Sequence, residues 1–225
     1  MTTEEIATKL QSSKSADRER AANAICKLKL TDLAEDLFAA FLKDTKENRS
    51  SYTRCAMIKA LGVLDFKKAL PEIKKIVVKN FIHDTLTGLA TTCYIQLKRK
   101  SIHDGEPVID ALKFGRYSVI NGALFALAVD QMVPKENEIK EIIKLCKNIN
   151  KHKDRIGHEY GLIDSRIYLA LACANWDPKL TIDFLNHCIV TAIDIDVQGK
   201  PYPNQKLVDV CNNSLNGKFS KKHLS

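Results

Sequence analysis

The chain has 225 residues, of which 45% are hydrophobic and 28% are charged, and its formal net charge is +8. This composition excludes a disordered chain, which lacks the apolar residues that build a core, and no apolar run reaches the roughly 20 residues of a membrane span. Gly and Pro, which break helices, number only nine and six. The sequence therefore favours an all-α protein.

The N-terminal residues and the cysteines indicate a cytoplasmic protein. The first ten residues, MTTEEIATKL, are acidic and amphipathic and lack the basic and apolar regions of a signal peptide. Seven cysteines lie between Cys26 and Cys211 without a CxxC motif, which favours small buried hydrophobic residues over disulfides or a metal site. We expect no membrane segment, no metal and no cofactor.

In the N-terminal part, residue spacing predicts a cap over residues 1–16 and then two helix pairs. Thr2 and Glu5 have the spacing of a capping box at the start of a helix over Thr2–Leu10. Apolar residues at three- and four-residue steps predict the helices that follow. These helices are Asp17–Leu30, Asp32–Lys43 and two within Ser51–Lys79, the second with Pro71 in its first turn.

The rest of the chain continues this pattern less regularly. Further helices are predicted at His83–Lys98, Asp104–Lys113, Arg116–Val129, Lys135–Asn150, His158–Ala174, Pro178–Ala192 and Gln205–Leu215. Residues 17–192 then form five helix pairs. In residues 193–225, a segment with Gly199, Pro201 and Pro203 predicts an ordered loop or crossover before a capping helix and a frayed basic tail. We expect a single domain over residues 1–225.

Small and apolar residues recur in the predicted helices with a constant offset. At an offset of 34, Arg20, Ala22, Cys26 and Leu30 align with Arg54, Ala56, Ala60 and Leu64. Ala90 follows Ala56 at 34 again, and Ala123 follows Ala90 at 33. A period in this range with two helices per unit is typical of a helical solenoid.

The stretch Ser51–Lys79 resembles a HEAT repeat. The matching residues are Arg54, Ala56, Ala60-Leu61-Gly62, Leu64, Ala69-Leu70-Pro71 and Ile76. The resemblance covers residues 17–79 as a motif and residues 17–192 as an architecture. It implies a right-handed α-solenoid of about five antiparallel helix pairs, whose second helices line a concave surface that usually binds a protein and sometimes a nucleic acid.

Residues on and beside the second helices are candidates for that concave surface. They are Lys74, Lys75, Lys79, Lys113, Arg116, Lys144, Lys147, Lys151, Asp183 and His187. Side by side, the basic residues would form a stripe that neutralises phosphates. Interleaved acidic residues, among them Glu72, Glu138 and Glu141, indicate the alternative of a solvated Lys/Glu surface.

Motifs that carry chemistry are weak in this sequence. It contains no glycine-rich phosphate loop and no GxSxG elbow, and His187-Cys188 and His158-Glu159 each supply fewer than three metal ligands. Trp176-Asp177 invites comparison with HEAT-like alkylpurine DNA glycosylases. Those enzymes surround a cleft Asp with several Trp, whereas this chain has one Trp, and Asp177 precedes Pro178 as a helix N-cap would.

Three functions follow from these observations. The first, which we favour, is a non-enzymatic protein-binding solenoid, either an adaptor or an immunity-type inhibitor that masks a toxin, with acidic patches such as Asp183, Asp194 and Asp196 in docking. The second is nucleic-acid binding through the lysine stripe. The third is an enzyme that acts on DNA bases, for which only Trp176 and Asp177 offer the stacking aromatic and the acid.

Overall fold

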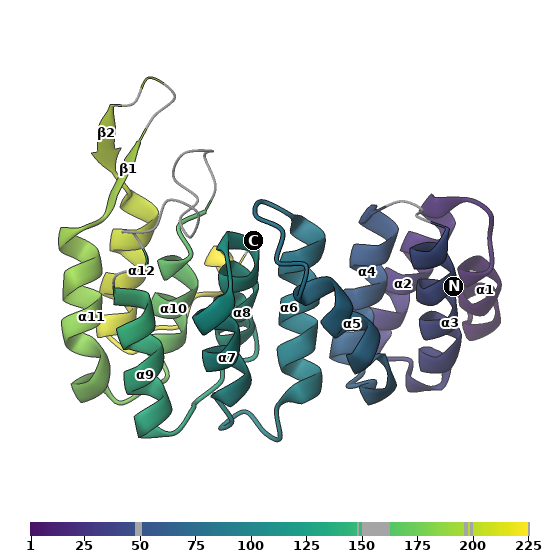
Figure 1. The fold of residues 1–225 in the computed structure, drawn as a ribbon, viewed down its shortest axis with the longest axis horizontal. Helices are drawn as coiled ribbons and strands as arrows, with labels where there is room; N and C mark the ends of the chain where they lie inside the picture. Colours follow the sequence, from purple (N-terminus) through teal and green to yellow (C-terminus); the bar gives the residue numbers. More distant parts are fainter. Residues whose placement is uncertain (48–50, 148, 150–162, 196–197, 199, 225) are drawn as a thin grey trace. The chain divides into compact units, whose positions relative to one another are not determined.

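The described part of the protein is helical apart from one short hairpin (Figure 1). The computed structural model describes residues 1–47, 51–147, 149, 163–195, 198 and 200–224. Among these residues there are twelve α-helices and a single two-stranded sheet, which confirms the all-α prediction. No helix among them is long and apolar enough to cross a membrane.

The helices divide between two compact units. Unit 1 consists of residues 1–80 and 84–98, and unit 2 of residues 81–83 and 99–225. Unit 1 contains α1 (Thr3–Leu10), α2 (Ser15–Leu28), α3 (Ala34–Lys46), α4 (Ser51–Val63), α5 (Leu70–Val77) and α6 (Thr85–Lys98). The third predicted helix pair is thus divided between the units, and the single domain stays a prediction.

Unit 2 contains the remaining helices and the hairpin. They are α7 (Glu106–Phe114), α8 (Tyr117–Val129), α9 (Glu136–Lys147), α10 (Arg166–Cys173), α11 (Pro178–Val190), β1 (Ile193–Ile195), β2 (Pro201–Pro203) and α12 (Gln205–Leu215). The predicted polar link 151–157 and the predicted start of the fifth pair at His158 lie outside the described residues.

Local sequence signals account for several helix starts. The capping box at α1 is confirmed, because the Thr2 Oγ1 accepts from the Glu5 N–H at 3.2 Å while the Glu5 Oε2 accepts from the Thr2 N–H at 2.9 Å. Asp177 caps α11, where its Oδ1 accepts from the Lys179 N–H at 2.9 Å. Pro71 lies in the first turn of α5, where its missing N–H costs no hydrogen bond.

In unit 1, helices pack against their neighbours in series. α2 packs against α4 and α4 against α6, while α3 packs against α4 and α5 against α6. Close approach depends on small residues: Ala60 and Ala90 are fully buried, and a Cβ on Gly62 of α4 would lie 3.3 Å from the Cα of Cys93 in α6. Small residues recur at the predicted 34-residue offset because these helices pack closely.

Unit 2 shows a similar serial arrangement. α8 packs against α10 and α10 against α12, while α7 packs against α9 and α9 against α11. The core between them is formed by fully buried aliphatic residues such as Leu124, Leu169 and Leu185. Repeated neighbour contacts within each unit are the pattern that a helical repeat produces.

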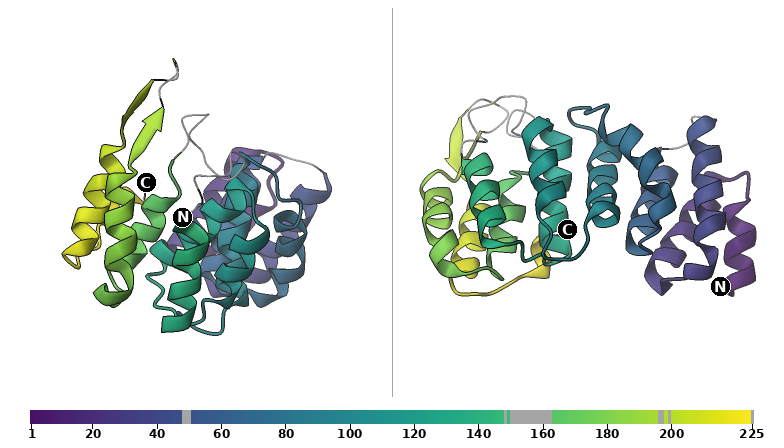
Figure 2. Two further views of the ribbon diagram at one scale, coloured as in Figure 1. Left: turned by 60° about the vertical axis from the view of Figure 1, so that its left-hand side comes forward. Right: turned by 60° about the horizontal axis from the view of Figure 1, so that its bottom comes forward.

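The main departure from the predicted elements lies between α11 and α12. Residues 193–204 were expected to form a loop or crossover, but β1 and β2 pair in antiparallel register there, with Ile193 opposite Pro203 and Ile195 opposite Pro201. The prolines are tolerated because they lie on the edge of a two-stranded ribbon. The hairpin projects beyond the ends of α11 and α12 in every view (Figures 1 and 2).

Candidate functional site

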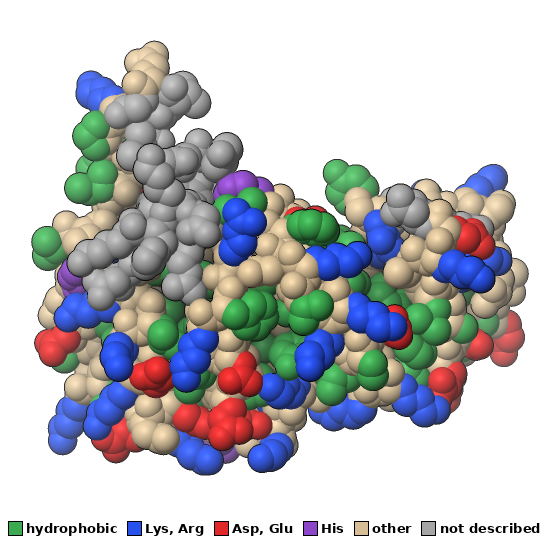
Figure 3. Space-filling model, viewed as in Figure 1, with side chains coloured by type: hydrophobic (Ala, Val, Ile, Leu, Met, Phe, Trp, Pro, Cys, Tyr) green, Lys and Arg blue, Asp and Glu red, His purple; other side chains and the backbone are tan. Residues whose placement is uncertain are grey.

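The hairpin and the adjoining end of α11 carry several exposed apolar side chains. Val190 is 81% exposed, Ile193 52% and Tyr202 48%, and both prolines of β2 are exposed as well. Figure 3 shows hydrophobic side chains along this edge of unit 2. We call Val190, Ile193, Pro201, Tyr202 and Pro203 the hairpin surface, in which Ile193, Pro201 and Pro203 share one face of the ribbon and Tyr202 lies on the other. Exposed apolar patches with polar rims are typical of interaction sites.

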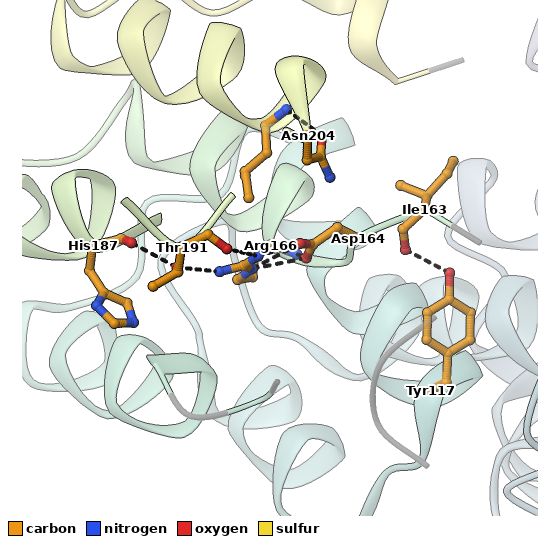
Figure 4. Close-up of polar contacts among 8 residues, drawn as sticks. Tyr117, Ile163, Asp164, Arg166, His187, Thr191 and Asn204 are labelled. Carbon is orange, nitrogen blue, oxygen red and sulfur yellow. Dashed lines mark hydrogen bonds and ion pairs between the residues drawn. The ribbon is translucent and has the colours of Figure 1, made fainter. Parts of the chain in front are cut away.

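A buried ion pair holds the chain at Thr191, where it enters the hairpin (Figure 4). The Arg166 side chain is 2% exposed and its Nη2 lies 2.6 Å from the Asp164 Oδ2, while its Nε donates to the same oxygen at 2.9 Å. The Arg166 Nη1 donates to the Thr191 Oγ1 at 2.8 Å, and the Thr191 carbonyl oxygen accepts from Nη2 at 3.2 Å. Thr191 follows α11 directly, so this pair fixes the point at which the chain leaves the helix.

We call the Asp164–Arg166 ion pair and its hydrogen bonds to Thr191 the clip. The Asp164 carboxylate keeps the Arg166 guanidinium protonated. Burial lowers the pKa of the Arg166 guanidinium, but the hydrogen bond to Asp164 and the charge of that carboxylate raise it, and the net pKa lies above the usual value. The Thr191 Oγ1 donates in turn to the His187 carbonyl oxygen at 2.7 Å. The clip thus connects the start of α10 with the end of α11.

Asn204 holds the chain where it leaves the hairpin and enters α12. Its side-chain Oδ1 caps α12 by accepting from the Leu207 N–H at 2.9 Å, and its backbone N–H donates to the Ala192 carbonyl oxygen at 2.9 Å. Asn204 is 5% exposed. Hydrogen bonds thus hold both ends of the hairpin, at Thr191 and at Asn204.

A neighbouring contact orders the chain just before the clip. The Tyr117 hydroxyl donates to the Ile163 carbonyl oxygen at 2.8 Å (Figure 4), and the Ser165 Oγ donates to the Asn121 Oδ1 at 3.1 Å. Burial raises the pKa of the Tyr117 hydroxyl, so this group keeps the proton that it donates. Residues 163–166 are therefore attached to α8 as well as to α11.

Two of the sequence-predicted binding residues lie on the helix that leads to the hairpin. Asp183 is exposed on α11 and His187 is half-buried one turn further on. Ile182, beside them, is 46% exposed. Asp183 and His187 thus lie on α11 within two turns of Val190, the first residue of the hairpin surface. The hairpin itself was not predicted from the sequence.

The basic candidates of unit 1 are exposed at the surface. Lys74 and Lys75 lie on α5 and Lys79 just after it. The Lys75 Nζ lies 2.6 Å from the Glu72 Oε1. Exposed ion pairs of this kind contribute about 0–1 kcal/mol, and they reduce the positive potential that a phosphate would meet.

The basic candidates of unit 2 are interspersed with acids. The Lys113 Nζ lies 3.9 Å from the Glu141 Oε1, and the Lys144 Nζ lies 3.8 Å from the Glu141 Oε2. Arg116 and Lys147 are exposed next to α8 and at the end of α9, whereas Lys151 lies outside the described residues. Figure 3 shows basic and acidic side chains mixed over α7 and α9. A single basic stripe stays a prediction.

A groove of about 380 Å³ lies between α7 and α9. Its lining residues are Glu106, Ile109, Asp110, Lys113, Asn137, Glu138 and Glu141. Glu138 is buried, and its Oε2 accepts from the Lys135 N–H at 2.9 Å and from the Gly105 N–H at 3.2 Å. Four carboxylates against one ammonium favour cations here over phosphates.

The Trp176-Asp177 pair has structural roles. Trp176 is 4% exposed and its Nε1 donates to the Met132 carbonyl oxygen at 2.7 Å, while Asp177 caps α11. The indole is thus packed inside unit 2 and joins the α8–α9 and α10–α11 connections. A glycosylase would need this ring to stack on a base, and its burial weakens that reading.

The cysteines lie mostly in the core, as predicted. All seven are free thiols, and five of them are buried, namely Cys93, Cys146, Cys173, Cys188 and Cys211. Burial raises the pKa of Cys93 and Cys173, and a hydrogen bond with the Cys211 thiol together with burial raises that of Cys188. Protonated thiols are poor nucleophiles. Among the described residues, no group of three or more His, Cys, Asp and Glu is arranged to hold a metal ion.

Cys55, which is half-buried, should react slowly with alkylating reagents. Burial, helped by the negative charge of Asp84, raises its pKa to about 11. Because only the thiolate reacts, we expect labelling by iodoacetamide at pH 8 to be about 100-fold slower than that of glutathione, and to rise about tenfold per pH unit until pH 11. Peptide mass spectrometry measures this rate, and labelling as fast as that of glutathione would contradict the burial seen here.

Comparison with protein-family models, with curated proteins and with solved structures gave no match. The resemblance to HEAT repeats therefore stays a prediction that depends on the residues of unit 1.

Proposed function

We propose that this chain is a non-enzymatic protein-binding protein that docks its partner on the hairpin surface. The observation that carries the proposal is the exposure of Val190, Ile193 and Tyr202 on a projection whose two ends are held by hydrogen bonds. Each such side chain contributes roughly 1.5–3 kcal/mol when it is fully buried. Tyr is among the residues that dominate interface energies, so Tyr202 is the leading candidate anchor.

The architecture that we propose is the HEAT-like α-solenoid. Serial packing of neighbouring helices within each unit and small residues at a 34-residue offset support it. In this proposal the chain acts as an adaptor, or as an immunity-type inhibitor that masks a toxin. Asp183 and His187 on α11 would form part of the polar rim beside the apolar anchors.

Site-specific photo-cross-linking in the native host tests the proposal. A photoreactive amino acid at position 202 should give one dominant adduct, whereas the same group at Tyr52, which is 77% exposed in unit 1, should give none. The identified partner, once purified, should bind with 1:1 stoichiometry. Equal adducts from both positions, or no adduct at 202, would contradict a docking site on the hairpin.

Replacement of Val190 by Asp should then weaken the purified complex about tenfold, because a charge would enter an apolar contact. Isothermal titration calorimetry measures this effect. Val78→Asp, at another exposed apolar residue (58%), is the matched control and should leave the affinity unchanged. The partner's own activity with and without the chain separates an adaptor from an inhibitor.

A further inference from the structure

Two Asn-Gly dipeptides occur in the chain, at residues 121–122 and 216–217. An asparagine before a glycine is chemically labile, because the backbone nitrogen of the next residue can attack the side-chain amide carbon and glycine has no side chain to obstruct it. The attack requires backbone rotation, so a dipeptide that is held inside a folded element is protected. The structure places the two dipeptides in opposite surroundings.

The first dipeptide lies inside a helix. Asn121 and Gly122 occupy the second turn of α8. Gly122 is buried, and the Asn121 Oδ1 accepts from the Ser165 Oγ at 3.1 Å. Attack by the Gly122 nitrogen would require α8 to open within the core of unit 2, and opening of a core helix costs much of the free energy of unfolding. The fold therefore protects Asn121.

The second dipeptide lies at the exposed end of α12. Asn216 is the first residue after the helix, and both it and Gly217 are exposed. Gly217 has a φ of +65°, a left-handed conformation that glycine adopts without strain. Beyond its chain neighbours, no atom of the described residues lies within 4 Å of the position that a Cβ would take there. The attacking nitrogen is thus not screened by packing.

Two hydrogen bonds hold the reacting groups of this dipeptide. The Gly217 N–H donates to the Ser214 carbonyl oxygen at 2.9 Å, and the Asn216 Nδ2 donates to the Asn212 carbonyl oxygen at 2.8 Å. Both acceptors lie in the last turn of α12, and the last turn of a helix frays at a small cost in free energy. Opening of this one turn therefore frees the nitrogen and the amide together.

We propose that Asn216 is a site of spontaneous deamidation. The Gly217 backbone nitrogen forms a bond to the Asn216 side-chain amide carbon, and the amide nitrogen leaves as ammonia with the proton that the backbone nitrogen gives up. Water then adds to either carbonyl carbon of the five-membered imide and breaks one C–N bond, which leaves aspartate or isoaspartate. This inference is independent of the proposed docking on the hairpin surface.

The product differs from the original chain in charge. A carboxylate replaces the neutral amide, which lowers the formal net charge of +8 by one. The new charge lies at the C-terminus of α12, where the helix dipole disfavours an anion. It also cannot donate to the Asn212 carbonyl oxygen as the Asn216 Nδ2 does. Deamidation should therefore loosen the last turn of α12.

Incubation of the purified full-length chain in mildly alkaline buffer, followed by tryptic digestion and tandem mass spectrometry, tests the proposal. Trypsin releases Asn216 in peptide 207–218 and Asn121 in peptide 117–135, and the same free peptides supply the reference rates. We expect Asn216 to deamidate within about tenfold of its peptide, and Asn121 to be more than about 100-fold slower than its peptide. A protein-isoaspartate methyltransferase with labelled S-adenosylmethionine detects the isoaspartate.

A variant at the neighbouring glycine tests the attacking group. Gly217→Ala puts a Cβ beside the nitrogen and should slow deamidation of Asn216 about tenfold, without an effect on Asn121. A rate at Asn216 that this variant leaves unchanged would overturn the proposal, because the Gly217 nitrogen would not be the nucleophile. Protection of Asn216 in the folded chain by more than about 100-fold would also overturn it, because the last turn of α12 would then not open readily.

Discussion

Replacing Arg166 by Met should lower the free energy of unfolding by about 3–5 kcal/mol, because it removes the guanidinium that pairs with the buried Asp164 carboxylate. Both side chains are at most 2% exposed, and the guanidinium supplies three hydrogen bonds to that carboxylate. The Arg166 backbone N–H still donates to the Asp164 Oδ1 in the variant, but a neutral donor does not replace the charge of the guanidinium. Urea denaturation followed by circular dichroism measures the loss.

Two comparisons isolate the buried charge as the cause. Asp164→Asn combined with Arg166→Met removes both charges and should recover part of the lost stability. Lys140→Met breaks an ion pair of 2.5 Å with Glu136 whose side chains are 61% and 66% exposed, and it should cost less than about 1 kcal/mol. If Arg166→Met cost no more than Lys140→Met, the clip would not stabilise unit 2.

The clip also links stability to the hairpin. Arg166 binds Thr191, the residue between α11 and the start of β1. Loss of the guanidinium would remove the hydrogen bonds that hold Thr191. Hydrogen exchange in residues 192–195 should therefore accelerate more than exchange in α8. The proposed docking on the hairpin surface would gain from this anchoring, because a disordered projection would lose conformational entropy on binding.

Helices were predictable from sequence because their signals are local. The 3.6-residue period and capping residues such as Thr2 and Asp177 act within one or two turns. α12 has the predicted bounds, Gln205–Leu215. The hairpin was missed because Gly199, Pro201 and Pro203 predict an ordered loop or crossover, although the alternation of Ile193, Asp194 and Ile195 is a strand signal.

The pairing and burial of charged side chains were not predictable in the same way. The lysines of α7 and α9 were correctly placed on helices, but Glu141 approaches both Lys113 and Lys144, and its approach to Lys113 depends on how the two helices pack. The buried position of Arg166 was not predictable for a similar reason, since arginine is exposed in most proteins. Pairings between distant segments, such as Arg166 with Thr191, decide these cases.

Trp176→Ala should destabilise the protein by about 3–5 kcal/mol, since it opens a cavity in unit 2 and removes the hydrogen bond to Met132. Trp176→Phe keeps most of the volume and leaves the Met132 carbonyl oxygen without its donor, which should cost about 1–3 kcal/mol. Urea denaturation measures both variants. Tyr52→Ala, at a side chain that is 77% exposed, is the control and should change stability by less than about 0.5 kcal/mol.

The same residue decides between packing and base recognition. Trp176 is the one tryptophan in the chain, so its fluorescence reports this position without interference from another indole. Burial predicts blue-shifted emission that acrylamide quenches weakly in the folded protein. A ring that stacks on an extruded base would instead be accessible, and single-stranded DNA would quench it. Strong acrylamide quenching together with a small stability loss in Trp176→Ala would favour the enzyme hypothesis over protein binding, because a ring that is free to stack contributes little to the core.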